Sequence, residues 1–140
     1  MTIYEKIDRV KELFKKHELW EDRYKELILL GKNLEALDEQ YKIEKYRVKG
    51  CQSQVWLFPE LKEGKVYFKA DSDALIVKGI VGLLVEVYSG EEPSVIMQHA
   101  PEFLKEIGIT DHLSMNRTNG LAAIVKSMKL YATAFQAMLK

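Results

Sequence analysis

The chain has 140 residues, of which 47% are hydrophobic and 30% are charged, so we expect residues 1–140 to form one globular domain. Its 21 basic and 21 acidic side chains cancel, which argues against nucleic acid or an anionic membrane as a partner. The start, MTIYEKIDRVKELF, is not a basic leader before an apolar run, and no stretch reaches the ~20 apolar residues of a membrane span. We therefore expect neither secretion nor membrane insertion, and the single cysteine, Cys51, predicts a reducing, cytoplasmic location without a disulfide.

The N-terminal part of the chain predicts two amphipathic helices joined as a hairpin. Apolar residues recur at helical spacing over residues 3–14, and Thr2 with Glu5 has the pattern of a capping box. A second apolar stripe begins at Trp20 and runs to Gly31. Because glycine is common just past a helix end, we expect Gly31 to act as the C-cap.

The middle of the chain predicts a small antiparallel sheet. Residues 33–45 are polar and irregular, which is typical of a surface connection. β-Branched and aromatic residues then gather in three runs, at residues 46–48, 55–59 and 66–68, with a Glu63-Gly64 turn before the third. We therefore expect about three antiparallel strands.

The remaining chain is predicted to be mostly helical. Residues 71–73, Asp-Ser-Asp, offer capping oxygens to a helix over residues 74–88 that is apolar on nearly every face. Gly79 and Gly82 weaken this helix, so we expect them to allow close packing against the sheet. Three further elements follow: a helical turn at Pro93, a short element of undecided type at 101–108, and a long amphipathic helix from Leu121 to the terminus. Several helices packed against a small sheet indicate an α+β fold.

Cys51 is the first candidate for chemistry. It falls at a bend, flanked by Gly50 on one side and by Gln52 to Gln54 on the other. Side chains at such bends can be reached by partners. The thiolate is the nucleophilic form of cysteine, and Lys49, two residues earlier, is expected to favour it.

Four stretches of the sequence are more specific than a short generic motif. They are Gly50-Cys51-Gln52-Ser53-Gln54-Val55-Trp56, Asp71-Ser72-Asp73-Ala74-Leu75-Ile76-Val77-Lys78-Gly79, Leu113-Ser114 and Arg117-Thr118-Asn119-Gly120-Leu121. Together they resemble the SufE/CsdE family of sulfur acceptors that work with cysteine desulfurases. The resemblance spans nearly the whole chain, and it implies an α+β fold similar to the SufE/IscU type.

The resemblance implies a sulfur carrier rather than a stand-alone enzyme. Cys51 would take persulfide sulfur from a cysteine desulfurase of the SufS or CsdA kind, stimulate that enzyme, and deliver sulfur to an iron–sulfur scaffold complex resembling SufBCD. The pyridoxal phosphate would reside on the desulfurase, so we expect no bound cofactor and no metal. Scaffolds of the IscU type hold a cluster with about three thiolates, which a monomer with one cysteine cannot supply. The resemblance does not decide whether two copies of this chain form a homodimer.

Six residues are predicted to support the cysteine loop or to bind the partner: Gly50, Gln52, Gln54, Asp73, Lys78 and Arg117. Most have a simpler interpretation as well. Asp73 could be only a helix cap, Lys78 only a surface side chain, and Arg117 only a cation in the first turn of the last helix. We expect Arg117 in particular to be a positive group near the cysteine or its partner.

Two other functions are compatible with the residues. The first is a cysteine-dependent hydrolase or thiol peroxidase that pairs Cys51 with His99 or His112, and the second is an adaptor with an inert cysteine. Under the sulfur-transfer hypothesis a persulfide must be sheltered and must also reach another active site. We therefore expect Cys51 to be poorly accessible in the free protein, turned toward Val55 and Trp56, and to swing out on docking.

Overall fold

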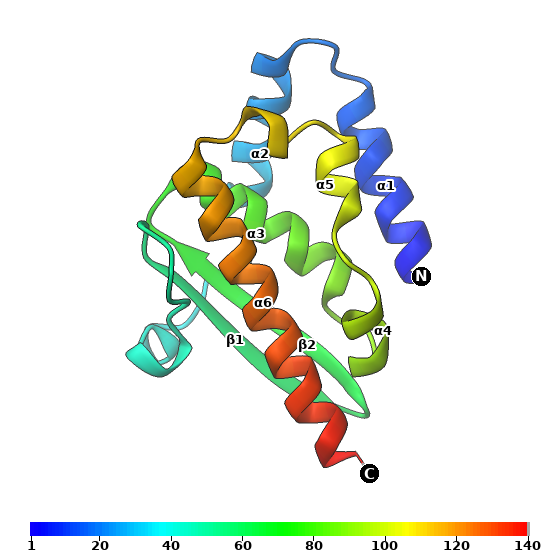
Figure 1. Ribbon diagram of the computed structural model, residues 1–140, viewed down its shortest axis with the longest axis vertical. Helices are drawn as coiled ribbons and strands as arrows, with labels where there is room; N and C mark the ends of the chain where they lie inside the picture. The colour runs from blue at the N-terminus through cyan, green and yellow to red at the C-terminus, as the bar shows by residue number, and fades with distance from the viewer. Residues whose placement is uncertain (140) are drawn as a thin grey trace.

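The computed structural model describes residues 1–139, the side chain of Asn116 excepted, so Lys140, the last residue of the predicted domain, lies outside the described residues. The described chain combines helices with a two-stranded antiparallel sheet, which confirms the predicted α+β class (Figure 1). Its helices and strands are α1 (Ile3–Lys15), α2 (Trp20–Lys32), β1 (Val55–Lys62), β2 (Lys65–Ser72), α3 (Leu75–Tyr88), α4 (Pro93–Gln98), α5 (Glu102–Glu106) and α6 (Met115–Met138). Short 3-10 turns are η1 (Glu39–Tyr41), η2 (Glu44–Tyr46) and η3 (Thr110–His112).

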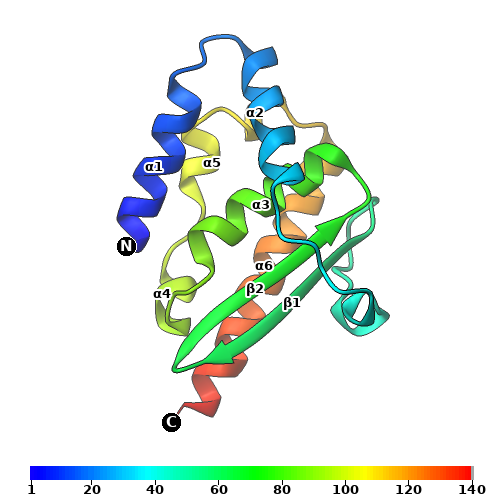
Figure 2. The ribbon, with the colours of Figure 1, turned by 180° about the vertical axis from the view of Figure 1, so that it is seen from behind.

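The hairpin of β1 and β2 carries helices on one of its faces. The two strands pair over their whole length, and Glu63 and Gly64 at the turn have φ angles of 52° and 79°, as a two-residue hairpin turn requires. Figures 1 and 2 show α6 crossing one face of this hairpin, with α3 beside it and the α1–α2 pair beyond α3. Alternate strand residues are buried on the covered side: Val55, Leu57, Val66, Phe68 and Ala70. Within residues 1–139, no helix combines the length and apolar character that crossing a membrane requires.

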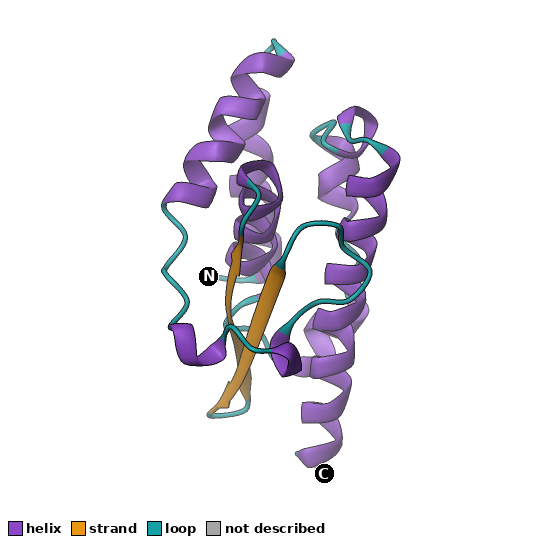
Figure 3. Ribbon diagram, turned by 90° about the vertical axis from the view of Figure 1, so that its left-hand side faces the viewer, coloured by secondary structure: helices purple, strands orange, loops and turns teal. Residues whose placement is uncertain are grey.

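The predicted third strand, at residues 46–48, is not formed. The chain makes the 3-10 turn η2 there, and only Arg47 forms a bridge to β1. Tyr46 instead packs edge-on against Phe58 of β1, with 5.0 Å between ring centroids. Tyr46, the aromatic residue of the predicted strand, therefore holds the surface connection against β1. Figure 3 shows this segment as a short helical turn beside the hairpin.

Two predicted helix starts also differ from the structure. Residues 71–72 belong to β2, and α3 has Ala74 as its N-cap without a side-chain capping bond, so residues 71–73 do not cap this helix. The last helix begins at Met115, six residues earlier than predicted from Leu121. Its N-cap is Ser114, whose hydroxyl accepts a hydrogen bond from the backbone N–H of Arg117 at 3.3 Å.

Helices α2 and α3 touch backbone to backbone. A Cβ atom on Gly79 would lie 2.2 Å from the carbonyl oxygen of Leu27, and one on Gly31 would lie 2.9 Å from the backbone nitrogen of Gly79. Gly31 is therefore a packing residue inside α2, which continues to Lys32, and not its C-cap. Gly79 packs against α2 rather than against the sheet, since only a residue without a side chain allows this approach.

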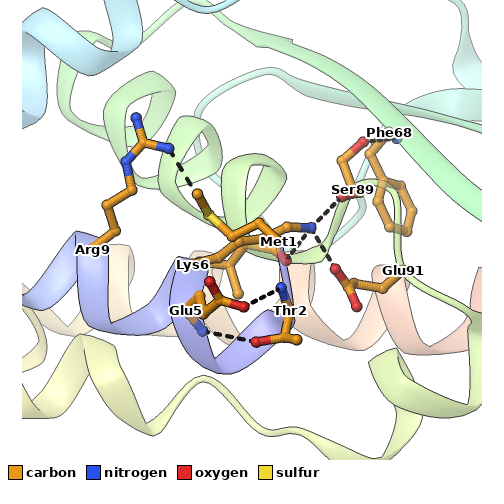
Figure 4. A network of polar contacts seen from close by, with 9 residues as sticks. Met1, Thr2, Glu5, Lys6, Arg9, Phe68, Ser89 and Glu91 are labelled. Atoms are coloured by element: carbon orange, nitrogen blue, oxygen red, sulfur yellow. Dashed lines mark hydrogen bonds and ion pairs between the residues drawn. The ribbon is translucent and has the colours of Figure 1, made fainter.

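The N-terminal helix is tied to the end of α3 by one lysine. The Lys6 ammonium donates to the carbonyl oxygen of Ser89 at 2.9 Å and to the Glu91 carboxylate at 2.5 Å (Figure 4). The predicted capping box of Thr2 and Glu5 is present at the start of the same helix. Because carbonyl groups at a helix C-terminus lack intrahelical partners, the Lys6 cation both satisfies and fixes this end of α3.

The glycine contact yields the first prediction. Replacement of Gly79 by alanine should lower the free energy of unfolding by roughly 3 kcal/mol or more, because the new methyl group meets a backbone oxygen that cannot move alone. Gly82→Ala is the matched control, since its nearest neighbour would be 3.4 Å away and alanine is the better helix former. Urea unfolding would measure both, and equal stabilities of the two variants would contradict the backbone contact.

Candidate functional site

Cys51 opens onto a pocket between the cysteine loop, which we define as residues 49–54, and the first turns of α3 and α6. The pocket has a volume of about 460 Å³ and is called here the cysteine pocket. Polar groups and an apolar wall share its surface. The described lining residues are Cys51, Gln52, Ser53, Val77, Ile80, Ser114, Arg117, Gly120, Leu121 and Ile124.

The thiol itself rests against the backbone of α6. The Cys51 Sγ donates to the carbonyl oxygen of Gly120 at 3.5 Å, and a Cβ on Gly120 would lie only 3.5 Å from the sulfur. The expected neighbours Val55 and Trp56 do not line the cysteine pocket, and the described contact of the sulfur is with α6. Gly50, with a φ of 94°, reverses the chain just before the cysteine and lays the loop across α6, a placement that depends on the tertiary path of a distant helix.

Burial decides the protonation of this thiol in the free protein. Cys51 is half-buried, and desolvation raises the pKa of its thiol, which favours the neutral form. Lys49 does not offset this from within the pocket, because it lines a separate groove between η2 and the middle of α6. Arg117 is the cation that lines the cysteine pocket, and its exposed side chain stands at the N-terminal turn of α6.

Asp73 holds the far end of the cysteine loop. Its carboxylate accepts a hydrogen bond from the backbone N–H of Gln54 at 3.0 Å, and its own N–H donates to the Gln54 carbonyl at 3.2 Å. The backbone of Gln54, rather than its exposed side chain, therefore joins the loop to the segment before α3. Asp73 therefore bonds to the cysteine loop in this structure and does not cap α3.

Lys78 lies beside the cysteine pocket without lining it. Its ammonium is 3.3 Å from the carboxylate of Asp71, which also binds Lys42 of the surface connection at 2.8 Å. Burial alone would raise the pKa of the Asp71 carboxyl, but hydrogen bonds from Lys42, from the Ser72 backbone and from Lys78 together hold it below its usual value. The three side chains tie α3, β2 and the surface connection together next to the site.

The three histidines lie elsewhere. His17 is 3.1 Å from the Glu26 carboxylate, His99 is 3.0 Å from the Tyr4 hydroxyl, and the His112 ring stacks on Trp20 with centroids 3.9 Å apart. Among the described lining residues of the cysteine pocket there is no histidine. Within residues 1–139, no group of three or more His, Cys, Asp or Glu side chains is arranged to hold a metal ion.

The sequence did not single out the residues that form the pocket wall. Ile80 and Ile124 were interpreted only as apolar helix residues, and Val77 was also part of a family-like stretch, because periodicity cannot separate core from pocket. Gly120 was part of a motif, but its carbonyl contact depends on how α6 crosses the loop. The only available signal was the glycine itself, directly before the predicted helix start at Leu121, which indicates close backbone approach without naming the partner.

Comparison with known proteins places this chain in a wider group. The SufE family model, described as the Fe-S metabolism associated domain, matches residues 8–132. An uncharacterized SufE-like protein of Synechocystis sp. is 38% identical over 135 residues, covering 96% of this chain and 85% of that protein. The sulfur acceptor protein CsdE of Escherichia coli is 34% identical over 111 residues, covering 78% of this chain and 76% of that protein.

A solved structure supports the fold as well. The solution structure of a hypothetical protein from Thermus thermophilus is similar to this chain with a TM-score of 0.79 at 25% sequence identity. The similarity covers 94% of this chain and 96% of that one. The α+β architecture and its helix–hairpin arrangement therefore recur in a distant sequence.

The loop attachment yields a second prediction. Asp73→Ala should speed the alkylation of Cys51 by a bulky thiol reagent about fivefold, because the loss of one hydrogen bond of ~1 kcal/mol raises the open fraction of the loop. Asp73→Asn keeps an acceptor oxygen and should react at nearly the wild-type rate. Asp111→Ala, which removes an exposed carboxylate away from the loop, is the charge control. Unchanged labelling of Asp73→Ala would show that the bond does not restrain the loop.

A third prediction concerns pH. Since only the thiolate reacts with iodoacetamide, the rate should rise through the pKa of Cys51, and burial should shift that midpoint to higher pH than in the urea-unfolded chain. Between neutral pH and the unfolded midpoint, the folded protein should therefore carry less thiolate than the unfolded one. A folded midpoint equal to or below the unfolded midpoint would contradict the effect of burial.

Proposed function

The chain belongs to the SufE family, and on this premise we propose that it is a sulfur acceptor that carries one sulfur atom on Cys51. The observation that carries the proposal is a half-buried thiol that opens onto a pocket with room for an added atom. A water molecule occupies about 30 Å³ in the liquid, so a pocket of about 460 Å³ accommodates an additional sulfur beside the thiol. The relative in Escherichia coli that is named a sulfur acceptor protein supports the same role.

The proposed reaction is thiol–persulfide exchange. The donor is a cysteine desulfurase that carries a persulfide on its own cysteine, with its pyridoxal phosphate on that partner. The Cys51 thiolate attacks the outer sulfur, a new S–S bond forms on Cys51, the donor's S–S bond breaks, and the donor cysteine leaves as a thiolate that takes up the proton. No net oxidation or reduction occurs, and the transfer frees the donor cysteine for another turnover.

The pocket serves this reaction in two ways. Val77, Ile80 and Ile124 form an apolar wall that shelters a loaded sulfur from water and from small reductants. Arg117, at the edge of the same pocket, places a positive charge where the thiolate develops during exchange. The resting thiol is therefore protected and mostly neutral, and it becomes a nucleophile when docking changes the position of the loop.

Exposed apolar residues beside the pocket favour docking of another protein. Leu75, at the start of α3, is 60% exposed, and Met115, at the start of α6, is 76% exposed. Leu75 is two residues from Val77 in α3, and Met115 directly follows Ser114. Val77 and Ser114 both line the cysteine pocket. Large apolar side chains at the rim of a site are typical of a surface that a partner covers.

The rival hypothesis has no support from this geometry. A hydrolase or peroxidase that uses a cysteine–histidine pair needs the two side chains within hydrogen-bond reach. The described contact of the Cys51 sulfur is with the Gly120 carbonyl, and the histidines are engaged at other places in the fold.

We further propose that the carried sulfur goes to an iron–sulfur scaffold complex in the cytoplasm.

Mass spectrometry provides the test and the fourth prediction. Incubation with a cysteine desulfurase and cysteine should add the mass of one sulfur atom to the intact protein, and dithiothreitol should remove it. Cys51→Ser, with unchanged circular dichroism, should gain no sulfur. No gain on the wild type, or an equal gain on Cys51→Ser, would overturn the proposal.

A further inference from the structure

A second hollow lies on the opposite side of the cysteine loop from the thiol. It is a groove of about 580 Å³. One side is formed by η2 and the residues that follow it into the cysteine loop, and the other by the middle of α6. Four of its lining residues are cations: Lys45, Arg47, Lys49 and Lys126. We call it the basic groove.

The charge of the basic groove is unbalanced in a chain whose total charge is zero. Among its described lining residues, Glu44 is the one acidic side chain, and it is 3.9 Å from Arg47 with both groups well exposed. No ion pair of Lys45, Lys49 or Lys126 is found in the part of the chain that the structure describes. The sequence of α6, residues 115–138, carries three cations and no acidic residue.

The groove also has an apolar end. Leu130 of α6 lines it and is 60% exposed, which is a high exposure for a leucine in the middle of a long helix. Ala123 and Ser127 form the smooth floor between this leucine and the cysteine loop. A groove with cations along its sides and an apolar residue at one end matches an extended protein segment that carries acidic and apolar side chains.

The groove is mechanically connected to the cysteine loop. A Cβ on Gly50 would be 3.4 Å from the Cβ of Ala123, so the loop backbone lies on the same helix surface that forms the groove floor. Lys49 lines the groove, whereas Cys51, two residues later, lines the cysteine pocket. Lys49 is the first residue of the cysteine loop, which we call its stem. A group that binds Lys49 therefore pulls directly on the loop that carries the thiol.

We propose that the basic groove binds an acidic segment of the sulfur-donating desulfurase, an inference that rests on the proposed function. The donor meets the protein when the thiol is still held by the Gly120 carbonyl and kept neutral by burial. It therefore needs a contact that moves the loop stem before exchange begins. Carboxylates that engage Lys45, Lys49 and Lys126 supply this contact and also steer the encounter of the two proteins.

A charge-reversal experiment provides the test and the fifth prediction. The double variant Lys45→Glu/Lys126→Glu should bind a cysteine desulfurase roughly tenfold more weakly by isothermal titration calorimetry, since two exposed attractions become repulsions. Lys25→Glu/Lys65→Glu makes the same change of net charge on α2 and β2, away from the groove, and should bind like wild type. Lys45→Arg/Lys126→Arg should also bind like wild type, and salt should weaken the wild-type complex.

The outcomes separate this inference from the function on which it rests. Inorganic polysulfide loads Cys51 without a protein partner, so the groove variant should gain sulfur from polysulfide at the wild-type rate. Failure of wild type to accept sulfur from the desulfurase would overturn both proposals. If wild type accepts sulfur normally but Lys45→Glu/Lys126→Glu and Lys25→Glu/Lys65→Glu bind the desulfurase equally well, the inference about the basic groove alone is overturned. It is also overturned if Lys45→Glu/Lys126→Glu loses binding to the scaffold complex but keeps binding to the desulfurase.

A photo-crosslink identifies the occupant directly. Benzoylphenylalanine placed at Ser127, on the groove floor, should attach to a desulfurase peptide rich in Asp and Glu. A crosslinked peptide without acidic residues, or preferential crosslinking to RNA, would contradict the proposed occupant.

Discussion

The contact between the Cys51 sulfur and the backbone of α6 at Gly120 governs the arrangement of the site. It holds the thiol inside the cysteine pocket, and it requires a residue without a side chain at that turn of the helix. The position of α6 is in turn fixed by its packing across the β1–β2 hairpin, where Ile124 and Met128 are buried. The site is thus a product of the helix–sheet packing rather than of the cysteine loop alone.

The same burial that shelters the sulfur reduces its reactivity. Desolvation raises the pKa of the Cys51 thiol, so the thiol of the free protein is a weak nucleophile, whereas a sulfur carried there under the proposed function would be sheltered. The loop is held at few points: the thiol at Gly120, the backbone at Ala123, and the two bonds between Gln54 and Asp73. A segment with so few attachments opens at low cost in free energy compared with unfolding of the core. A partner that binds both the pocket rim and the basic groove would act on the first two of these points, at Gly120 and at Ala123.

The helices and the hairpin followed from local chemistry, and the exceptions have particular physical reasons. The Thr2–Glu5 capping box, the Glu63-Gly64 turn and the apolar periods of α1, α3 and α6 each depend on residues close together in the chain, so they were predicted correctly. The prediction of a third strand was wrong because the Tyr46 ring packs against Phe58 of β1, and the segment around it does not form strand hydrogen bonds. The roles of Gly31 and Gly79 were assigned to the wrong neighbours because a glycine indicates close approach without specifying which backbone approaches.

The sequence by itself predicted that one thiol is the candidate for the chemistry, that it lies on a loop at a glycine, and that the chain resembles sulfur acceptors. Those conclusions depend on residue identity and on spacing along the chain. Only the tertiary structure decided that the sulfur faces Gly120, that Asp73 supports the loop through Gln54, and that Lys49 belongs to a separate groove. These contacts join residues up to 69 positions apart, and their geometry follows from the packing of α6 on the hairpin, which no local pattern encodes.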